Sequence, residues 1–253
     1  MSSESLTELQ RWKCICAYDG GGFSGWQSQT DGTGVQDAIE RRLKTIFGLE
    51  TRIHGSGRTD AGVHALAQVF HFDSAWRHGP GKLLAAMRTG LPQTIQVKST
   101  RAVARGFHSR FDATGKVYFY RIHHGGFADP FENRYCWSIP AKLNVAAMRA
   151  GARQLVGKHD FKAFAAINGV ERETTVRNLR RLEVTERGLD LRITAEADGF
   201  LYKMVRSLVG GLVAAGEGKL TPDALGAILC GARRTHVVQT APAQGLFLAK
   251  VFY

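Results

Sequence analysis

Apolar and polar positions follow a regular order of elements in the first half of the chain. Every second residue from Trp12 to Tyr18 is apolar or aromatic, and this alternation predicts a strand. From Val35 to Phe47 the apolar residues recur at helical spacing, and Gly48 follows as a helix stop. The same reasoning predicts further strands at 51–54, 66–72 and 95–103 and a helix at 81–89. The predicted order is βαββαβ.

The second half repeats this order. The predicted elements are a strand at 116–123, a helix at 143–156, a hairpin of 175–185 and 189–197 about Gly188, a helix at 200–215, a short helix after Thr221-Pro222 and a strand at 246–253. Two βαββαβ units in one chain predict paired ferredoxin-like halves, an arrangement also used by RNA-binding domains. We expect the halves to span residues 1–105 and 106–253, because Gly106 and a basic run interrupt the pattern there.

Charge narrows the class of partner. The 34 lysines and arginines exceed the 22 acidic residues by 12, so the chain is strongly basic. This excess makes nucleic acid the first partner to consider. The hydrophobic fraction of 44% and the charged fraction of 22% are those of a globular protein, and they exclude a fibre or a disordered tail.

Cysteine usage and the N-terminal sequence bear on the compartment. The four cysteines lack metal-ligand spacing, and Cys14 and Cys16 are expected to be small buried hydrophobic residues of one strand. We find no signal-peptide pattern and no apolar stretch of the length of a membrane span. The sequence therefore predicts a cytoplasmic, reduced protein.

A glycine-rich segment between two predicted strands carries the candidate chemistry. Residues 55–64 place Arg58 two residues before Asp60, and the glycines permit a tight loop that a ligand can approach closely. An arginine near an aspartate keeps the carboxylate ionised, as a nucleophile or a general base requires. The alternative is a surface turn with an ordinary ion pair. No GxSxG, Walker or HExxH motif supports a hydrolase, phosphoryl-transfer or metalloprotease function.

The segment at 57–65, GRTDAGVHA, resembles the catalytic motif of the TruA-type tRNA pseudouridine synthases. The resemblance extends along nearly the whole chain. Its further motifs are YDG at 18–20, GWQ at 25–27, FHSRF at 107–111, KVYFYR at 116–121, FLYKMVR at 200–206 and APAQGL at 241–246. Ser109 departs from the alanine usual in the family.

The resemblance implies an α+β pseudouridine synthase fold, in which two ferredoxin-like halves form a continuous, mainly antiparallel sheet flanked by helices. It further implies isomerisation of uridine to pseudouridine at positions 38 to 40 of the anticodon arm of tRNA, by a homodimer without metal or cofactor. Asp60 of the N-terminal half matches the family's nucleophile. Whether it forms a covalent adduct or promotes a glycal intermediate stays open.

The other matching positions lie in the C-terminal half, apart from Arg58. Tyr118 corresponds to the tyrosine that stacks on the flipped base, and it is the candidate to take the C5 proton. Arg58 and Arg206 correspond to the active-site arginines, of which Arg206 is expected to pair with Asp60. Leu246 is expected to form the floor of the pocket. Candidate phosphate contacts are Arg41, Arg42, Lys44, Arg177, Arg180 and Arg181.

Two alternatives remain to be compared with this interpretation. A non-catalytic RNA-binding protein with two RRM-like halves would stack bases on sheet aromatics, but the nearest segment, KVYFYR, lacks the glycine of the RNP1 pattern. A nucleoside hydrolase would need a cluster of carboxylates to activate water, and Asp60 has no acidic residue near it in sequence.

Overall fold

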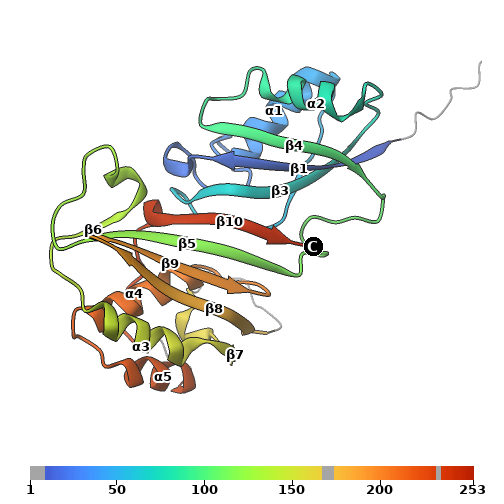
Figure 1. Cartoon of the computed structure of the whole chain (residues 1–253). Helices are drawn as coiled ribbons and strands as arrows, with labels where there is room; N and C mark the ends of the chain where they lie inside the picture. The colour runs from blue at the N-terminus through green and yellow to red at the C-terminus, as the bar shows by residue number, and fades with distance from the viewer. Residues whose placement is uncertain (1–8, 167–173, 232–234) are drawn as a thin grey trace, which may run out of the picture. The chain divides into compact units, whose positions relative to one another are not determined.

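The computed structural model describes residues 9–166, 174–231 and 235–253 (Figure 1). The chain divides into two units. Unit 1 runs to Ala113 and includes Tyr253, and unit 2 runs from Thr114 to Phe252. Among the described residues, no helix is both long enough and apolar enough to cross a bilayer.

Unit 1 has a ferredoxin-like strand order. Its elements are β1 (Gln10–Tyr18), the 3-10 turn η1 (Gly20–Gly22), α1 (Val35–Phe47), β2 (His54–Gly55), β3 (His64–Ser74), α2 (Gly79–Arg88) and β4 (Ile95–Val103). The strands are ordered β4-β1-β3-β2, and every pair is antiparallel. This order places β1 and β3 at the centre of the unit 1 strands.

Local contacts explain where α1 begins and ends, and burial in the core of unit 1 stabilises it. The Asp37 side chain accepts the Gly34 N–H at 2.9 Å, so one exposed backbone donor at the helix start is satisfied. Gly48 adopts a φ of 73° after the last turn, the left-handed conformation that commonly ends helices. Between these ends, Ile39 and Leu43 are fully buried, and burial of this apolar stripe stabilises the helix.

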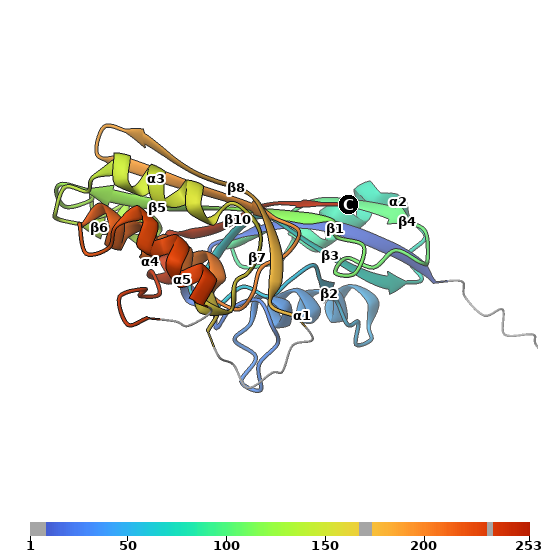
Figure 2. The same ribbon diagram turned by 90° about the horizontal axis from the view of Figure 1, so that it is seen from below.

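Unit 2 has the same order with two additions. Its elements are β5 (Gly115–His124), η2 (Asn133–Tyr135), β6 (Trp137–Ile139), α3 (Val145–Leu155), β7 (Gly157–Asp160), η3 (Lys162–Phe164), β8 (Val176–Arg187), β9 (Asp190–Ala197), α4 (Met204–Gly216), α5 (Pro222–Gly231), η4 (Ala243–Gly245) and β10 (Leu246–Phe252). The order β10-β5-β9-β8 is antiparallel and ferredoxin-like, β7 extends it beside β8, and the short β6 pairs in parallel with β5. Helix α3 packs against α4, α5 and β8 (Figure 2).

These arrangements confirm the α+β class and the ferredoxin-like halves, and they correct two elements. The predicted helix at 200–215 begins only at Met204, because Lys203 takes a left-handed φ of 57° and the residues before it are not helical. In place of the predicted strand at 51–54, the structure has only β2 at His54–Gly55, which shares one residue with the prediction. β6 and β7 were not predicted, because both are short and neither alternates clearly between apolar and polar residues.

Candidate active site

Asp60 lies on the loop between β2 and β3, and two glycines from other segments lie against that loop. A Cβ atom on Gly20 would stand 2.0 Å from the Val63 carbonyl oxygen. A Cβ atom on Gly25 would stand 2.5 Å from the Thr59 carbonyl oxygen, and Gly25 also has a φ of +95°. Real side chains do not approach backbone this closely, so both positions require glycine. The YDG and GWQ motifs therefore hold the loop that carries Asp60.

Hydrogen bonds fix the backbone on both sides of Asp60. The Tyr18 hydroxyl lies 2.8 Å from the Thr59 hydroxyl, and the Trp26 N–H donates to the Thr59 carbonyl at 3.1 Å. On the other side, the Val63 N–H donates to the Asp60 carbonyl at 3.1 Å. Asp60 itself is half-buried. The loop that carries the Asp60 carboxylate therefore has a backbone conformation restrained by hydrogen bonds on both sides.

The start of this loop is anchored to β3 by a buried amide. Gln68 is fully buried, its amide nitrogen donates to the Gly57 carbonyl at 2.8 Å, and its amide oxygen lies 2.7 Å from the Ser56 hydroxyl. Arg58, the next residue along the loop, is exposed. After the loop, buried His64 accepts the Gly20 N–H at Nδ1, 3.0 Å away.

Tyr118 occupies the centre of β5 in unit 2. The residue is 8% exposed, and its ring packs edge-on against Phe200 with 5.2 Å between ring centroids. Phe200 precedes α4 and belongs to the segment that the sequence placed inside that helix. The late start of α4 therefore provides the contact that orients the Tyr118 ring.

Arg206 lies in the first turn of α4, tied to the segment before η4. Its Nε donates to the Ala241 carbonyl at 2.7 Å, and the Ala241 N–H donates back to the Arg206 carbonyl at 3.0 Å. The segment can approach because residue 210 is glycine: a Cβ there would stand 1.8 Å from the Gln239 carbonyl oxygen. Arg206 also lies close enough to Tyr120 to oppose the rise in the pKa of that phenol, which burial causes.

Leu246 is paired with Tyr120 across β10 and β5, two residues along β5 from Tyr118. Unit 2 thus gathers Arg206 and Leu246 beside Tyr120, while unit 1 presents Arg58 and Asp60 on one loop. Tyr18, Gly25 and Gly210 were not assigned these roles from the sequence. For Tyr18 and Gly25, the sequence signal that could have indicated these roles was that they belong to the YDG and GWQ motifs.

Several arginines that are candidate phosphate contacts also make hydrogen bonds or ion pairs within the protein. Arg42 donates through Nε and Nη2 to the Ala86 carbonyl, at 2.9 and 2.6 Å. Arg180 donates to the Thr114 carbonyl at 2.8 Å, and Arg181 lies 3.6 Å from a Glu196 oxygen. Part of the positive charge therefore supports the fold.

The phenylalanine pair Phe119 and Phe247 on the sheet of unit 2 is not open to bases. The rings of Phe119 and Phe247 stack on each other at 4.8 Å, and the Arg192 guanidinium lies 4.0 Å from the Phe119 ring centroid. The two phenylalanines are only 7% and 9% exposed. This arrangement disfavours the RRM-like alternative, which needs exposed aromatic faces.

Comparison with known proteins gives one family. The sequence profile of the family described as "tRNA pseudouridine synthase" matches residues 15–112 and 152–253. A "tRNA pseudouridine synthase A" from Brevibacillus brevis is 41% identical over 245 residues, which are 97% of this chain and 100% of that protein. Proteins of the same name from Rhodopseudomonas palustris and Akkermansia muciniphila are 41% and 40% identical over 97% of this chain, covering 100% and 96% of their own lengths.

Proposed function

The chain belongs to the TruA family of tRNA pseudouridine synthases, which are isomerases, and from this premise we propose that it modifies uridines 38 to 40 in the anticodon arm with Asp60 as nucleophile. The observation that carries the proposal is the loop at 57–65. It combines the family's motif with a backbone held on both sides of Asp60 by hydrogen bonds and by two close-packed glycines. A nucleophile needs such a fixed position relative to the atom that it attacks.

The reaction requires only rearrangement of the substrate's own atoms. The C1′–N1 bond breaks, the uracil turns within the site, a C1′–C5 bond forms, and the proton leaves C5 while N1 gains one. In one route the Asp60 carboxylate attacks C1′ and is displaced when C5 bonds to that carbon. In the other route Asp60 removes the C2′ proton as uracil leaves C1′, which gives a glycal intermediate, and C2′ regains a proton from Asp60 when C5 bonds to C1′. Both routes need an ionised carboxylate at the start and a base for the C5 proton.

The remaining roles follow the family's pattern. Tyr118 is proposed to stack on the flipped uracil and to accept the C5 proton, and the edge contact with Phe200 supports its fixed orientation. Arg206 is proposed to pair with Asp60, Arg58 to contact the RNA, and Leu246 to bound the base pocket. The enzyme is proposed to act as a homodimer in the cytoplasm, where its tRNA substrate is found.

The test uses an anticodon stem-loop transcript and Asp60→Asn. This change keeps the size of the side chain and removes the nucleophile, so pseudouridine formation should fall by at least about 1000-fold with tRNA affinity nearly unchanged. Asp223→Asn, which alters an exposed carboxylate on α5, is the matched control and should retain full activity. In the same assay Tyr118→Phe should bind tRNA and lose most turnover. Appreciable turnover by Asp60→Asn would refute the nucleophile assignment.

A further inference from the structure

Unit 1 contains a cavity of about 640 Å³ that none of the proposed catalytic residues lines. It lies between the end of α1 and the end of β3, where residues 46–52 face residues 71–78. The Asp60 loop joins β3 at its other end, at His64, and Ser74 lies ten residues further along. At about 3.3 Å per residue, the two ends of the strand are roughly 30 Å apart. The cavity is therefore a separate feature of unit 1.

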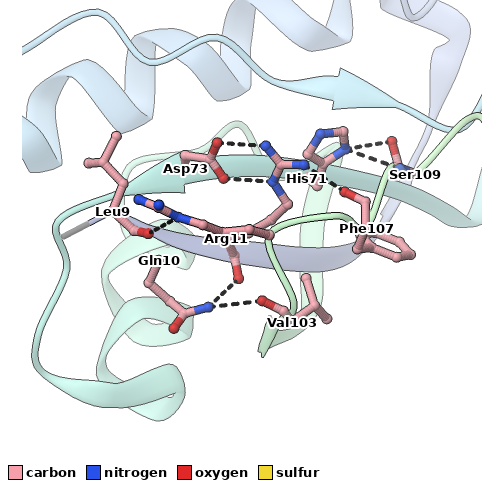
Figure 3. A network of polar contacts seen from close by, with 9 residues as sticks. Leu9, Gln10, Arg11, His71, Asp73, Val103, Phe107 and Ser109 are labelled. Carbon is pink, nitrogen blue, oxygen red and sulfur yellow. Dashed lines mark hydrogen bonds and ion pairs between the residues drawn. The ribbon is translucent and has the colours of Figure 1, made fainter.

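One wall of the cavity is a fixed polar network (Figure 3). Arg11 donates to both carboxylate oxygens of Asp73 at 2.8 and 2.7 Å, and to the Phe107 carbonyl at 2.8 Å. The hydrogen bond from Arg11 lowers the pKa of Asp73, so the two charges cancel. Beside them, Nδ1 of His71 lies 2.9 Å from the Ser109 hydroxyl, and burial lowers the pKa of His71 to about 4. This wall is held by several hydrogen bonds and has no net charge at neutral pH.

A second wall is aromatic. Trp76 is half-buried, and its indole N–H donates to the Gly79 carbonyl at 2.9 Å, which fixes the ring. Phe47 packs against Trp76 and Phe72, with ring centroids 6.1 and 6.0 Å apart. The cavity therefore offers a pre-oriented aromatic surface, which is the type of surface on which unstacked bases are held.

Positive charge lies beside the aromatic wall. Arg77 follows Trp76 directly and is exposed, whereas the other arginine across the cavity, Arg52, lies 3.2 Å from a Glu40 carboxylate oxygen. An exposed cation next to an aromatic ring matches the phosphate and the base of a single nucleotide.

We propose that this cavity receives one unstacked nucleotide of the bound tRNA, with its base against Trp76 and its phosphate at Arg77. The inference rests on tRNA being the substrate. The volume lies within the roughly 300–1,000 Å³ of pockets that enclose small ligands. Roughly 30 Å separate the two ends of β3, so a tRNA bound at Asp60 has to extend along this strand for one of its nucleotides to reach Trp76. The site adds affinity and takes no part in the chemistry.

The first test measures tRNA affinity in the Asp60→Asn background, so that turnover does not alter the RNA. Trp76→Ala should weaken binding about tenfold, and Trp76→Phe, which keeps a ring, should restore most of it. Arg77→Ala should weaken binding about threefold to fivefold. Lys82→Ala removes an exposed cation of α2 that does not line the cavity, and it should change affinity less than twofold. The proposal is wrong if Trp76→Ala and Arg77→Ala bind tRNA as Lys82→Ala does.

The second test distinguishes binding of a nucleotide within an RNA chain from binding of a free nucleotide. Ultraviolet irradiation of the tRNA complex should crosslink RNA to the peptide that contains Trp76, and uridine or adenosine monophosphate at 1 mM should not compete. Competition by either mononucleotide at micromolar concentration would overturn the assignment to RNA. In the active enzyme, Trp76→Ala should raise KM for tRNA and leave kcat unchanged. The effect of Trp76→Ala on KM reports tRNA binding. It therefore still tests the cavity if Asp60→Asn proves active and the nucleophile assignment fails.

Discussion

Gly25 shows how a single residue of a motif can set the position of the loop that carries the proposed nucleophile. Its φ of +95° is open to glycine and strained for other residues, and its Cα lies against the Thr59 carbonyl. A side chain there would displace the backbone immediately before Asp60. The hydroxyl contact between Tyr18 and Thr59 holds the same residue of the loop. The motifs around the loop thus define where the carboxylate lies.

We predict that Gly25→Ala destabilises the protein and slows pseudouridine formation together. Backbone strain and the 2.5 Å approach should cost about 2–4 kcal/mol, which lowers Tm by roughly 5–10 °C for a chain of this size. Thermal unfolding and initial rates on the stem-loop transcript measure both effects. Gly22→Ala is the control, because a Cβ on Gly22 meets nothing within 4 Å. Equal Tm and equal rates for the two variants would contradict this account of the loop.

At the scale of elements, the sequence predicted those with strong local signals. α1 carries an apolar stripe and a glycine stop, and β4 was predicted with its observed bounds, Ile95–Val103. The start of α4 was wrong because tertiary contacts decide it: Phe200 packs on Tyr118, which leaves the residues before Met204 outside the helix. The resemblance to a family supplied the candidate catalytic residues. The cavity beside Trp76 had no sequence signal, since its walls come from separate segments.

The contact between α4 and the segment at 239–241 leads to a prediction for Gly210→Ala. The added methyl group would meet the Gln239 carbonyl at 1.8 Å, so backbone has to move, at a cost of about 2–4 kcal/mol. The movement should break the hydrogen bond from Arg206 to Ala241 and lower kcat at least tenfold. Chemical denaturation and single-turnover rates are the measurements. The control is Gly231→Ala on α5, where a Cβ meets nothing within 4 Å. Wild-type kcat in Gly210→Ala would show that this contact does not position Arg206.

At the scale of the whole molecule, the positively charged side chains behind the net charge of +12 fall into two sets. Some guanidinium groups are partly buried and donate to carbonyl oxygens within the fold: Arg11 donates to Phe107 and Arg42 donates to Ala86. Others, such as Arg58 and Arg77, are exposed. Only the exposed arginines can contact phosphates and release counterions when RNA binds. The formal net charge therefore overstates the electrostatic contribution to tRNA affinity.

The salt dependence of tRNA binding should reveal this division. We consider a plot of the logarithm of the association constant against the logarithm of the salt concentration. If all 12 excess positive charges contacted phosphates, the slope of this plot would be near −11. We expect a slope of about −4 to −7, measured between 50 and 300 mM KCl. Arg58→Ala should make the slope shallower by about one. Arg42→Ala removes the same charge but should instead lower stability by about 1–2 kcal/mol through its lost bonds to Ala86, with the slope unchanged. Equal changes of slope in the two variants would mean that Arg42 reaches the RNA, and that the fold does not hold it in place.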